Sequence, residues 1–325
     1  MSKIAVIGGA GYIGSVVSHE LRDMGHEVTI FDNFSTGHRR FVKDFDVFEG
    51  DIASTEDIHR FFSFYQPEAL LHFAAKALVS EGEEKAVSYY RNNTLASMQL
   101  FLQAIESGCQ RFIFSSTAAV YGIPKSTPID EGVKLDPVNI YGKTKKSTED
   151  FLFALAEKGL CQVISFRYFN AAGASSRYAV GEDHDPETHL IPNVCNAILQ
   201  GKNLQIFGND YQTQDGTCVR DFIHVDDLSR AHCLGLSYLL QDKDAKSQAI
   251  NLGTTTGYSI LEIVSQAKRL FGDFNFEYQD RRAGDPDNLV ASNAKAKEIL
   301  GWVPEHSLES ILTSAMAWHK KTTSA

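Results

Sequence analysis

The glycine-rich segment from Gly8 to Gly14, Gly-Gly-Ala-Gly-Tyr-Ile-Gly, constrains the fold more than any other stretch of the chain. It follows a short apolar run of strand type, Lys3 to Ile7, and it opens a stretch with helical hydrophobic spacing. Glycines at these positions permit a tight turn, a close backbone approach to a pyrophosphate, and a helix N-terminus aimed at its charge. Asp32 ends the next apolar run, 18 residues after Gly14. This context predicts a dinucleotide-binding turn, for which an acid is expected about 20 residues on.

The acid at position 32 indicates which dinucleotide is bound. A carboxylate at the end of the second strand accepts hydrogen bonds from a ribose hydroxyl and repels a 2′-phosphate. We therefore expect NAD rather than NADP. Arg39 and Arg40 lie nearby in the sequence and are the residues that would hold a phosphate in the alternative case.

Strands and helices alternate over the first half of the chain. Apolar runs of strand length occupy 47–49, 69–73, 111–115 and 161–166, and helical patterns occupy 58–64, 83–107 and 141–158. This order predicts an α/β fold with a doubly wound parallel sheet of the Rossmann type. Ligands of such sheets bind outside the carboxyl ends of the strands. Asp51, Ala74 and Thr117 all follow strands and are expected to face one crevice.

A candidate general base is Tyr141, which opens the helical pattern at 141–158. Lys145 lies one turn further on and so on the same face of the helix. A neighbouring ammonium favours the phenolate and lowers the phenol pKa from its usual value of about 10, as does a cationic nicotinamide. A hydroxyl at Ser116 or Thr117 would hold a substrate alcohol against the phenol. Beside a dinucleotide these groups predict proton abstraction from an alcohol, whereas an accidental pair on a solvated helix is the alternative.

The second half of the chain predicts a smaller α/β lobe. The regular alternation ends near residue 168, so we expect a cofactor domain at 1–168 with returning segments near 222–255, and a lobe at 169–325. A strand at 249–252 is expected to return to the main sheet. Ser259 and Glu262 predict a capping box at the start of a helix that runs to about Phe271. Further helices are predicted at 190–199, 226–240, 294–300 and 307–319.

Charged side chains in this lobe suggest an anionic ligand. Arg220, Arg281 and Arg282 are candidates for holding a diphosphate, and pairing of Arg220 with its neighbour Asp221 is the alternative. His184 and His189 stand in a polar loop containing a proline. Their five-residue spacing lacks the i,i+4 geometry of a helical zinc pair, so we predict loop structure and no metal.

Composition narrows the class of protein. Of 325 residues, 43% are hydrophobic and 22% are charged, as in soluble globular proteins. A formal charge of −10 disfavours nucleic acid or an anionic membrane as a partner. Five widely spaced cysteines fit reduced thiols of a cytoplasmic protein. No leader pattern precedes the first strand, and no apolar run approaches the ~20 residues that span a bilayer.

Several segments together carry a resemblance to a known family. They are Gly8 to Gly14, Ser115 to Gly122 (Ser-Ser-Thr-Ala-Ala-Val-Tyr-Gly), Tyr141 to Lys145 (Tyr-Gly-Lys-Thr-Lys), Arg167 to Asn170 (Arg-Tyr-Phe-Asn), and Phe207 to Asp227. Over nearly its whole length the chain resembles the extended short-chain dehydrogenase/reductase superfamily and, within it, the UDP-glucose (UDP-galactose) 4-epimerases. The last segment is the closest to an epimerase signature.

The resemblance implies an isomerase of galactose metabolism that holds NAD tightly. UDP-galactose would be converted to UDP-glucose through a transient 4-keto sugar. Tyr141 would take the 4-OH proton, Thr117 would bind the 4-oxygen, and Lys145 would hold the ribose and lower the tyrosine pKa. As in relatives, the helix at 83–107, with its stripe of Leu95, Met98, Leu102 and Ile105, and the Tyr141 helix would pair with a second subunit. A core role for that stripe is the alternative.

The resemblance also assigns binding residues by matching position. The NAD-binding residues would be Gly8, Gly11, Tyr12, Ile13, Gly14, Asp32, Asn33, Phe34, Ser35, Thr36, Gly37, Asp51, Ile52, Phe73, Ala74, Ala75, Lys76, Ala77, Asn92, Ser115, Ser116, Tyr141, Lys145 and Phe169. The substrate-binding residues would be Thr117, Tyr141, Asn170, His189, Leu190, Gln205, Ile206, Phe207, Arg220, Arg282, Asp285 and Leu289.

Some positions depart from the family pattern. Thr117 stands where serine is common, and the hydroxyl is retained. His189 stands where some members have asparagine. Leu289 stands where a tyrosine in some members restricts the 2-substituent of the sugar, so N-acetylated substrates remain open.

Two other functions are consistent with parts of the pattern. A nucleotide-sugar 4,6-dehydratase on the same fold needs an acid beside the strand-end hydroxyl, but Ala118 and Ala119 follow Thr117 here. A regulator that senses NAD without chemistry has no need of Tyr141, Lys145 and a hydroxyl together. The epimerase is therefore the function that we expect.

Overall fold

A seven-stranded sheet forms the centre of the first of two units in the computed structural model, which describes residues 1–282 and 284–323. The strand order is β12-β6-β5-β4-β1-β2-β3, and each neighbouring pair from β6 to β3 is parallel. The strands are β1 (Lys3–Ile7), β2 (Glu27–Asp32), β3 (Asp46–Glu49), β4 (Ala69–His72), β5 (Arg111–Thr117), β6 (Gln162–Tyr168) and β12 (Gln248–Leu252). The strand predicted at 249–252 does return to this sheet.

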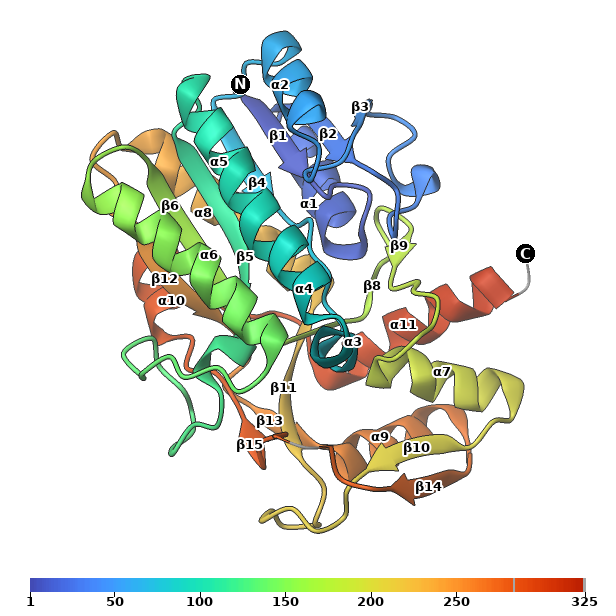
Figure 1. Cartoon of the computed structure of the whole chain (residues 1–325). Coiled ribbons are helices and arrows are strands. Elements are labelled where there is room, and N and C mark those ends of the chain that lie inside the picture. Colours follow the sequence, from blue (N-terminus) through green and yellow to red (C-terminus); the bar gives the residue numbers. More distant parts are fainter. Residues whose placement is uncertain (283, 324–325) are drawn as a thin grey trace. The chain divides into compact units, whose positions relative to one another are not determined.

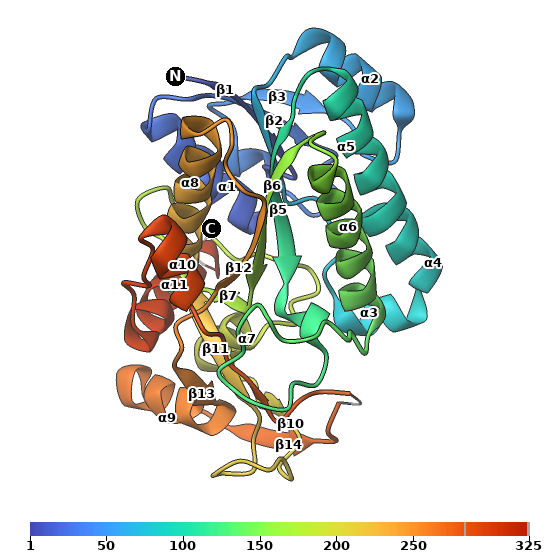
Figure 2. The same ribbon diagram turned by 90° about the vertical axis from the view of Figure 1, so that its left-hand side faces the viewer.

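Helices cover both faces of the sheet, as the edge-on view in Figure 2 shows. One face carries α2 (Thr55–Phe64), α5 (Ser97–Glu106) and α6 (Ile140–Glu157), and the other carries α1 (Tyr12–Asp23) and α8 (Val225–Gln241) (Figure 1). Strands covered on both sides are apolar along their length instead of alternating, which explains why all four residues of β4 are buried. The predicted doubly wound α/β fold is confirmed.

The helix predicted at 83–107 is divided into shorter pieces. These are α3 (Val79–Glu84), α4 (Ala86–Tyr89), a π-helical stretch η2 (Tyr90–Ala96), and α5. Lys85, with φ −118° and ψ 43°, leaves the helical conformation and separates α3 from α4. From Ala86 to Glu106 the helical backbone continues without a gap, with a π-helical stretch in its middle, so the predicted long helix is confirmed except that it begins after Lys85.

Two residues of the apolar stripe predicted on that helix are exposed instead of buried in the core. Leu95 and Leu102 are 63% and 40% exposed. The buried side of α5 is formed by Leu100, Phe101 and Ala104. The interpretation of the stripe as core therefore fails for Leu95 and Leu102, which form an apolar outer surface, whereas Ile105 packs against the core of the unit.

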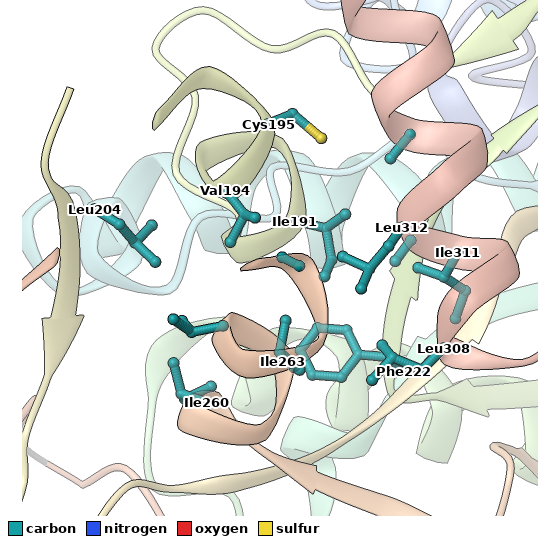
Figure 3. Close-up of a cluster of buried hydrophobic side chains, with 14 of the residues drawn as sticks. Ile191, Val194, Cys195, Leu204, Phe222, Ile260, Ile263, Leu308, Ile311 and Leu312 are labelled. Atoms are coloured by element: carbon teal, nitrogen blue, oxygen red, sulfur yellow. The ribbon is translucent and has the colours of Figure 1, made fainter. Parts of the chain in front are cut away.

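The second unit is built around its own apolar core. Its helices are α7 (Leu190–Gln200), α9 (Ile260–Phe271), α10 (Ala294–Leu300) and α11 (Leu308–Thr323), and its strands are β7 (Asn170–Ala172), β8 (Ala174–Ser175), β9 (Val180–Gly181), β10 (Leu204–Phe207), β11 (Val219–His224), β13 (Gly257–Ser259), β14 (Phe276–Gln279) and β15 (Asn288–Leu289). Figure 3 shows side chains from α7, α9, α11, β10 and β11 meeting in this core. The predicted capping box at Ser259 and Glu262 is confirmed.

The units divide the chain at several points. The first unit comprises 1–122, 134–168 and 229–250, and the second comprises 123–133, 169–228 and 251–325. Segment 123–133 was not singled out in the sequence. Ile129 attaches it to the second unit, because its backbone N–H donates to Val290 (2.8 Å) and its carbonyl accepts from Ser292 (2.7 Å).

A buried ion pair lies between α6 and the sheet of the first unit. Glu149 is 1% and Arg167 is 5% exposed, and their side chains are hydrogen-bonded to each other. Arg167 also donates to the Tyr121 hydroxyl (3.0 Å), and Ser116 donates to Glu149 (2.7 Å). Both buried charges are thus compensated by each other and by hydrogen bonds to neighbouring hydroxyls.

All five cysteines are free and buried. Within the described residues, none of the helices combines the length and the apolarity that crossing a bilayer demands.

We predict that Glu149→Gln lowers the free energy of unfolding by about 3–5 kcal/mol, because it leaves the Arg167 charge buried and uncompensated. Asp150→Asn, at the next residue of the same helix, is the matched control. It removes the exposed ion pair of Asp150 with Lys146 and should lower the free energy of unfolding by less than about 1 kcal/mol. Urea unfolding of the two variants measures both effects. Equal losses would contradict the assignment of a buried pair.

Candidate active site

The turn after β1 is shaped by two glycines that the fold itself requires. Gly8 has φ +75°, and a Cβ there would lie 2.5 Å from the backbone nitrogen of Ala74. A Cβ on Gly14 would lie 2.4 Å from the carbonyl oxygen of Gly8. Gly11 differs, since its φ is −75° and its Cβ would meet nothing closer than 3.4 Å. The backbone at Gly11, where α1 begins, is therefore open to a ligand, as a pyrophosphate-binding turn requires.

Asp32 lies beside this turn and is held by backbone donors. Its carboxylate accepts hydrogen bonds from Ala10 N (2.9 Å) and Phe34 N (2.8 Å). Burial raises the pKa of its carboxyl group. Each carboxylate oxygen has more than one lone pair, so the group can still accept a ribose hydroxyl. Arg39 is paired with Glu49 at 2.6 Å, which weakens its case as the ligand of a 2′-phosphate.

Most of the remaining residues predicted for NAD lie near these two features in the first unit. Tyr12 and Ile13 begin α1. The side chain of Asn33, just after β2, donates to that of Asp51 (3.1 Å), just after β3. The residues neighbouring these two in the same loops are Phe34, Ser35, Thr36, Gly37 and Ile52. Phe169 belongs to the second unit and is 9% exposed.

Tyr141 and Thr117 meet because the start of α6 packs on the turn after β5. Asn139 caps α6 by accepting from Gly142 N (2.8 Å). A Cβ at Gly142 would lie 2.5 Å from the carbonyl oxygen of Ala119 in the short helix η3 (Ala118–Tyr121). The Thr117 hydroxyl accepts from Ala119 N (3.1 Å) and lies close enough to the Tyr141 phenol to lower its pKa. The structure thus brings together the predicted base and a strand-end hydroxyl.

Lys145 lies beneath this pair and is 1% exposed. Its Nζ donates to the carbonyl oxygen of Ser115 (2.7 Å). Burial lowers the pKa of Lys145 to about 7 and raises the pKa of Tyr141 to about 12, although the hydrogen bond with Thr117 acts to lower it. The predicted depression of the tyrosine pKa is therefore absent in the protein alone, since desolvation of the phenol outweighs the opposing effect of Thr117.

The serines before Thr117 face other partners. The Ser116 hydroxyl is fully buried and donates to Glu149 (2.7 Å). The Ser115 hydroxyl forms a hydrogen bond with the Tyr168 hydroxyl. Of the two hydroxyls that the sequence left open, Thr117 is the one that meets Tyr141.

Asn93 is a buried residue beside the predicted NAD-binding segment that the sequence reasoning missed. It is 1% exposed, accepts from Lys76 N (2.9 Å) and donates to Lys76 O (2.8 Å). It also donates to Thr144 of α6 (3.3 Å) and accepts from the predicted Asn92 (2.9 Å). It therefore fixes the segment 73–77 predicted to line NAD. Two adjacent asparagines within a helical pattern were the available signal, because asparagine is a poor helix former.

In the second unit, Arg220 pairs with Asp285 at 2.6 Å. The expected alternative pairing of Arg220 with Asp221 is wrong, because Asp221 accepts from Thr254 N (2.8 Å) and Ala291 N (3.1 Å). Tyr211, which the sequence reasoning missed, donates to the other oxygen of Asp285 (2.9 Å).

The strand partners of β11 bring two more predicted residues beside it. Leu289 of β15 pairs with Arg220, and Asn170 of β7 pairs with Phe222.

The other residues predicted for the sugar nucleotide lie on β10 and in the loop at 281–285. The guanidinium of Arg282 stacks over the ring of Phe207 at 4.1 Å. Gln205 is exposed, whereas Ile206 is 1% exposed and packs in the core of the unit. Only the backbone of Ile206 is thus available to a ligand. In the predicted segment from Arg282 to Asp285, Ala283 lies outside the described residues.

The histidine loop is irregular, as predicted, but it gathers four side chains. Glu182, His184, Glu187 and His189 place one possible ligand atom each within 4.8 Å of the others. His189, predicted to contact substrate, lies 2.9 Å from Glu182 and 3.0 Å from Glu187. Leu190, also predicted, begins α7 directly after it.

Comparison with known proteins shows close similarity along the whole chain. The NAD dependent epimerase/dehydratase family matches residues 4–253. A UDP-glucose 4-epimerase of Rhizobium leguminosarum bv. trifolii is 44% identical over 321 residues, 98% of each chain. The crystal structure of UDP-glucose 4-epimerase from Brucella ovis in complex with NAD has a TM-score of 0.93 and 41% identity over 98% of each chain. That of UDP-glucose-4-epimerase from Stenotrophomonas maltophila, with bound NAD and formylated UDP-arabinopyranose, has a TM-score of 0.95 and 32% identity, covering 100% of this chain and 99% of that one.

The different surroundings of the glycines give a test of the dinucleotide turn. We predict that Gly11→Ala changes stability by less than about 1 kcal/mol and weakens NAD binding at least tenfold, because the methyl group occupies the open approach. Gly14→Ala should destabilise by about 1–3 kcal/mol, since its Cβ collides with backbone. Thermal unfolding and calorimetric NAD titration measure the two effects. Wild-type NAD affinity in Gly11→Ala would show that this turn does not hold the pyrophosphate.

Proposed function

The chain belongs to the NAD dependent epimerase/dehydratase family, and on this premise we propose that it is an NAD-dependent isomerase that interconverts UDP-galactose and UDP-glucose at C4. The observation that carries the proposal is the proximity of the Tyr141 phenol to the Thr117 hydroxyl, which lowers the pKa of Tyr141, in the same unit as the glycine turn open at Gly11. An alcohol bound between these two groups meets a proton acceptor and a hydroxyl at once, which is the arrangement that oxidation of a carbinol needs.

Each side chain of the first unit has a distinct part in the reaction. Tyr141 takes the proton of the sugar 4-OH, and Thr117 holds the 4-oxygen in place. Bound NAD accepts hydride from C4 and returns it, and the positive charge of its oxidised ring favours the phenolate. The resulting 4-keto sugar would turn in the site, so that hydride would return to the opposite face of C4 while Tyr141 returns the proton to the 4-oxygen. Lys145 is assigned to the nicotinamide ribose, with Ser115 O holding its ammonium.

We assign the uridine diphosphate to the second unit. Arg220 has five N–H donors, and those to Val219 O and Asp285 are accounted for within the protein. The other donors suit a diphosphate, for which planar guanidinium groups are well shaped. Arg282, stacked over Phe207, adds a second positive charge.

The 4,6-dehydratase alternative is not favoured by the turn after β5. Removal of water across C5 and C6 requires an acid beside the strand-end hydroxyl. The residues that follow Thr117 are Ala118 and Ala119, in η3. A regulator that only senses NAD leaves the contact between Tyr141 and Thr117 without a purpose.

We further propose a cytoplasmic homodimer. Val87, Leu95 and Leu102 are 73%, 63% and 40% exposed on α4, η2 and α5. Contiguous exposed apolar surface of this kind marks a protein interface. The cytoplasmic assignment is supported by five buried free thiols, which suit a reducing compartment.

The purified protein should convert UDP-galactose to UDP-glucose without added NAD, because the cofactor is regenerated in each turnover. We predict that Tyr141→Phe retains NAD and loses turnover by at least about 100-fold, the usual contribution of a general base. Chromatography of the nucleotide sugars and absorbance of bound NAD measure both. Tyr121→Phe controls for loss of a buried phenol elsewhere in the unit. A 4-keto-6-deoxy product would select the dehydratase, and full activity in Tyr141→Phe would remove the proposed base.

The dimer is tested by placing charge on the exposed stripe. We predict that the double variant Leu95→Lys, Leu102→Lys sediments as a monomer with an unchanged fold, because both side chains are largely exposed in the single chain. Val303→Lys, at a comparably exposed apolar position of the second unit, should leave the oligomeric state unchanged. A wild-type protein that sediments as a monomer would refute the interface.

A further inference from the structure

Four side chains of the second unit converge between β9 and α7 in a way that the proposed reaction does not explain. Glu182, His184, Glu187 and His189 each direct one ligand atom into a region where all four atoms lie within 4.8 Å of one another. The proposed epimerisation does not use Glu182, His184 or Glu187.

The separations between these atoms suit a small cation at their centre. His189 Nδ1 lies 2.9 Å from a Glu182 oxygen and 3.0 Å from a Glu187 oxygen. His184 Nδ1 lies 3.4 Å and 3.9 Å from the same two carboxylates. Zinc bonds of 2.0–2.2 Å in tetrahedral geometry place donor atoms roughly 3.3–3.6 Å apart. The four observed separations fall on both sides of that value, and the two from Glu187 are made by different oxygens, Oε1 towards His189 and Oε2 towards His184. A tetrahedral arrangement therefore requires shifts of these side chains.

Both glutamates are oriented by further contacts. Oε1 of Glu187 accepts from the backbone N–H groups of Thr188 and His189, each at 2.8 Å, and Oε2 lies on the side of His184 (3.9 Å). Glu182 is 5% exposed, and its carbonyl oxygen accepts from Trp318 Nε1 of α11 (3.1 Å). Outer contacts of this kind orient the ligands in metal sites.

Hydrogen bonding alone leaves this cluster incomplete. His184 Nδ1 is buried and makes no hydrogen bond with any of the described residues, although it lies 3.4 Å from Glu182. Two carboxylates also converge on one nitrogen of His189, which carries at most one proton. A buried carboxylate such as Glu182 is costly without full compensation. A divalent cation would satisfy the orphaned nitrogen and balance both negative charges.

We propose that Glu182, His184, Glu187 and His189 form a structural binding site for a divalent transition-metal cation, with zinc as the best fit. Two imidazoles together with two carboxylates suit zinc, whereas calcium and magnesium prefer oxygen ligands throughout. Four protein ligands leave no position open, which is the mark of a structural site. The cation would connect Glu182, which directly follows β9, to His189, which directly precedes α7. Metal binding does not require the proposed epimerase activity, although His189 is also one of the residues that the resemblance assigns to the substrate.

Metal binding is tested on untagged protein stripped with a chelator. Titration with zinc chloride is expected to bind one zinc per chain by elemental analysis and to raise Tm, because a ligand that binds only the folded state stabilises it. Cobalt(II) in place of zinc should give the intense visible bands of tetrahedral coordination. Wild-type protein that takes up no zinc would overturn the proposal.

His184→Ala separates the metal site from a simple ion-pair cluster. The side chain is partly exposed, so the variant should keep the wild-type Tm in the presence of chelator. It should bind zinc more than about 100-fold more weakly, because it loses a direct ligand, and show no zinc-dependent rise in Tm. His59→Ala, which removes an exposed histidine of α2, should respond to zinc as wild type does. The proposal fails if zinc uptake survives in His184→Ala, or if that variant lowers Tm in chelator while zinc affects neither protein.

Discussion

The close approach of three backbone segments at the end of β1 is the constraint on which the first unit depends. Gly8, Gly14 and Ala74 leave no room for a side chain between them. Because β1 lies between β4 and β2 in the sheet, this contact fixes the start of α1 and the exit of β4 together. The same turn supplies Ala10 N, which holds Asp32. The backbone at Gly11 is thus left open because Gly8 and Gly14 make the close backbone contacts of this turn.

Desolvation is the second physical effect that governs the site, and it shifts the pKa values of neighbouring groups in opposite directions. Burial disfavours the charged form of both Lys145 and Tyr141, so it lowers the lysine pKa and raises that of the phenol. Glu149 and Arg167 escape the same penalty by pairing with each other. That pair also occupies the Ser116 hydroxyl, which is why Thr117 is the hydroxyl that meets the tyrosine.

Sequence reasoning succeeded where a local pattern is sufficient and failed where partners are distant. The glycine turn, the alternating strands and helices, and the capping box at Ser259 each follow from residues close in the chain. The irregular backbone at Lys85 carried no such signal, because hydrophobic spacing continued past it. The partner of Arg220 was missed for a different reason: Asp285 is 65 residues away, whereas Asp221 is adjacent.

The sequence by itself determined the fold class, the position of the glycine turn after β1 and the proximity of Tyr141 to a strand-end hydroxyl, because the order of strands and helices and the helical periodicity follow from local spacing. Only the tertiary structure decided which hydroxyl that is, that Asn93 supports the segment 73–77, and that the stripe through Leu95 and Leu102 faces outward. It also decided that Glu182, His184, Glu187 and His189 meet. These outcomes depend on burial and on contacts between elements, which periodicity along one element does not encode.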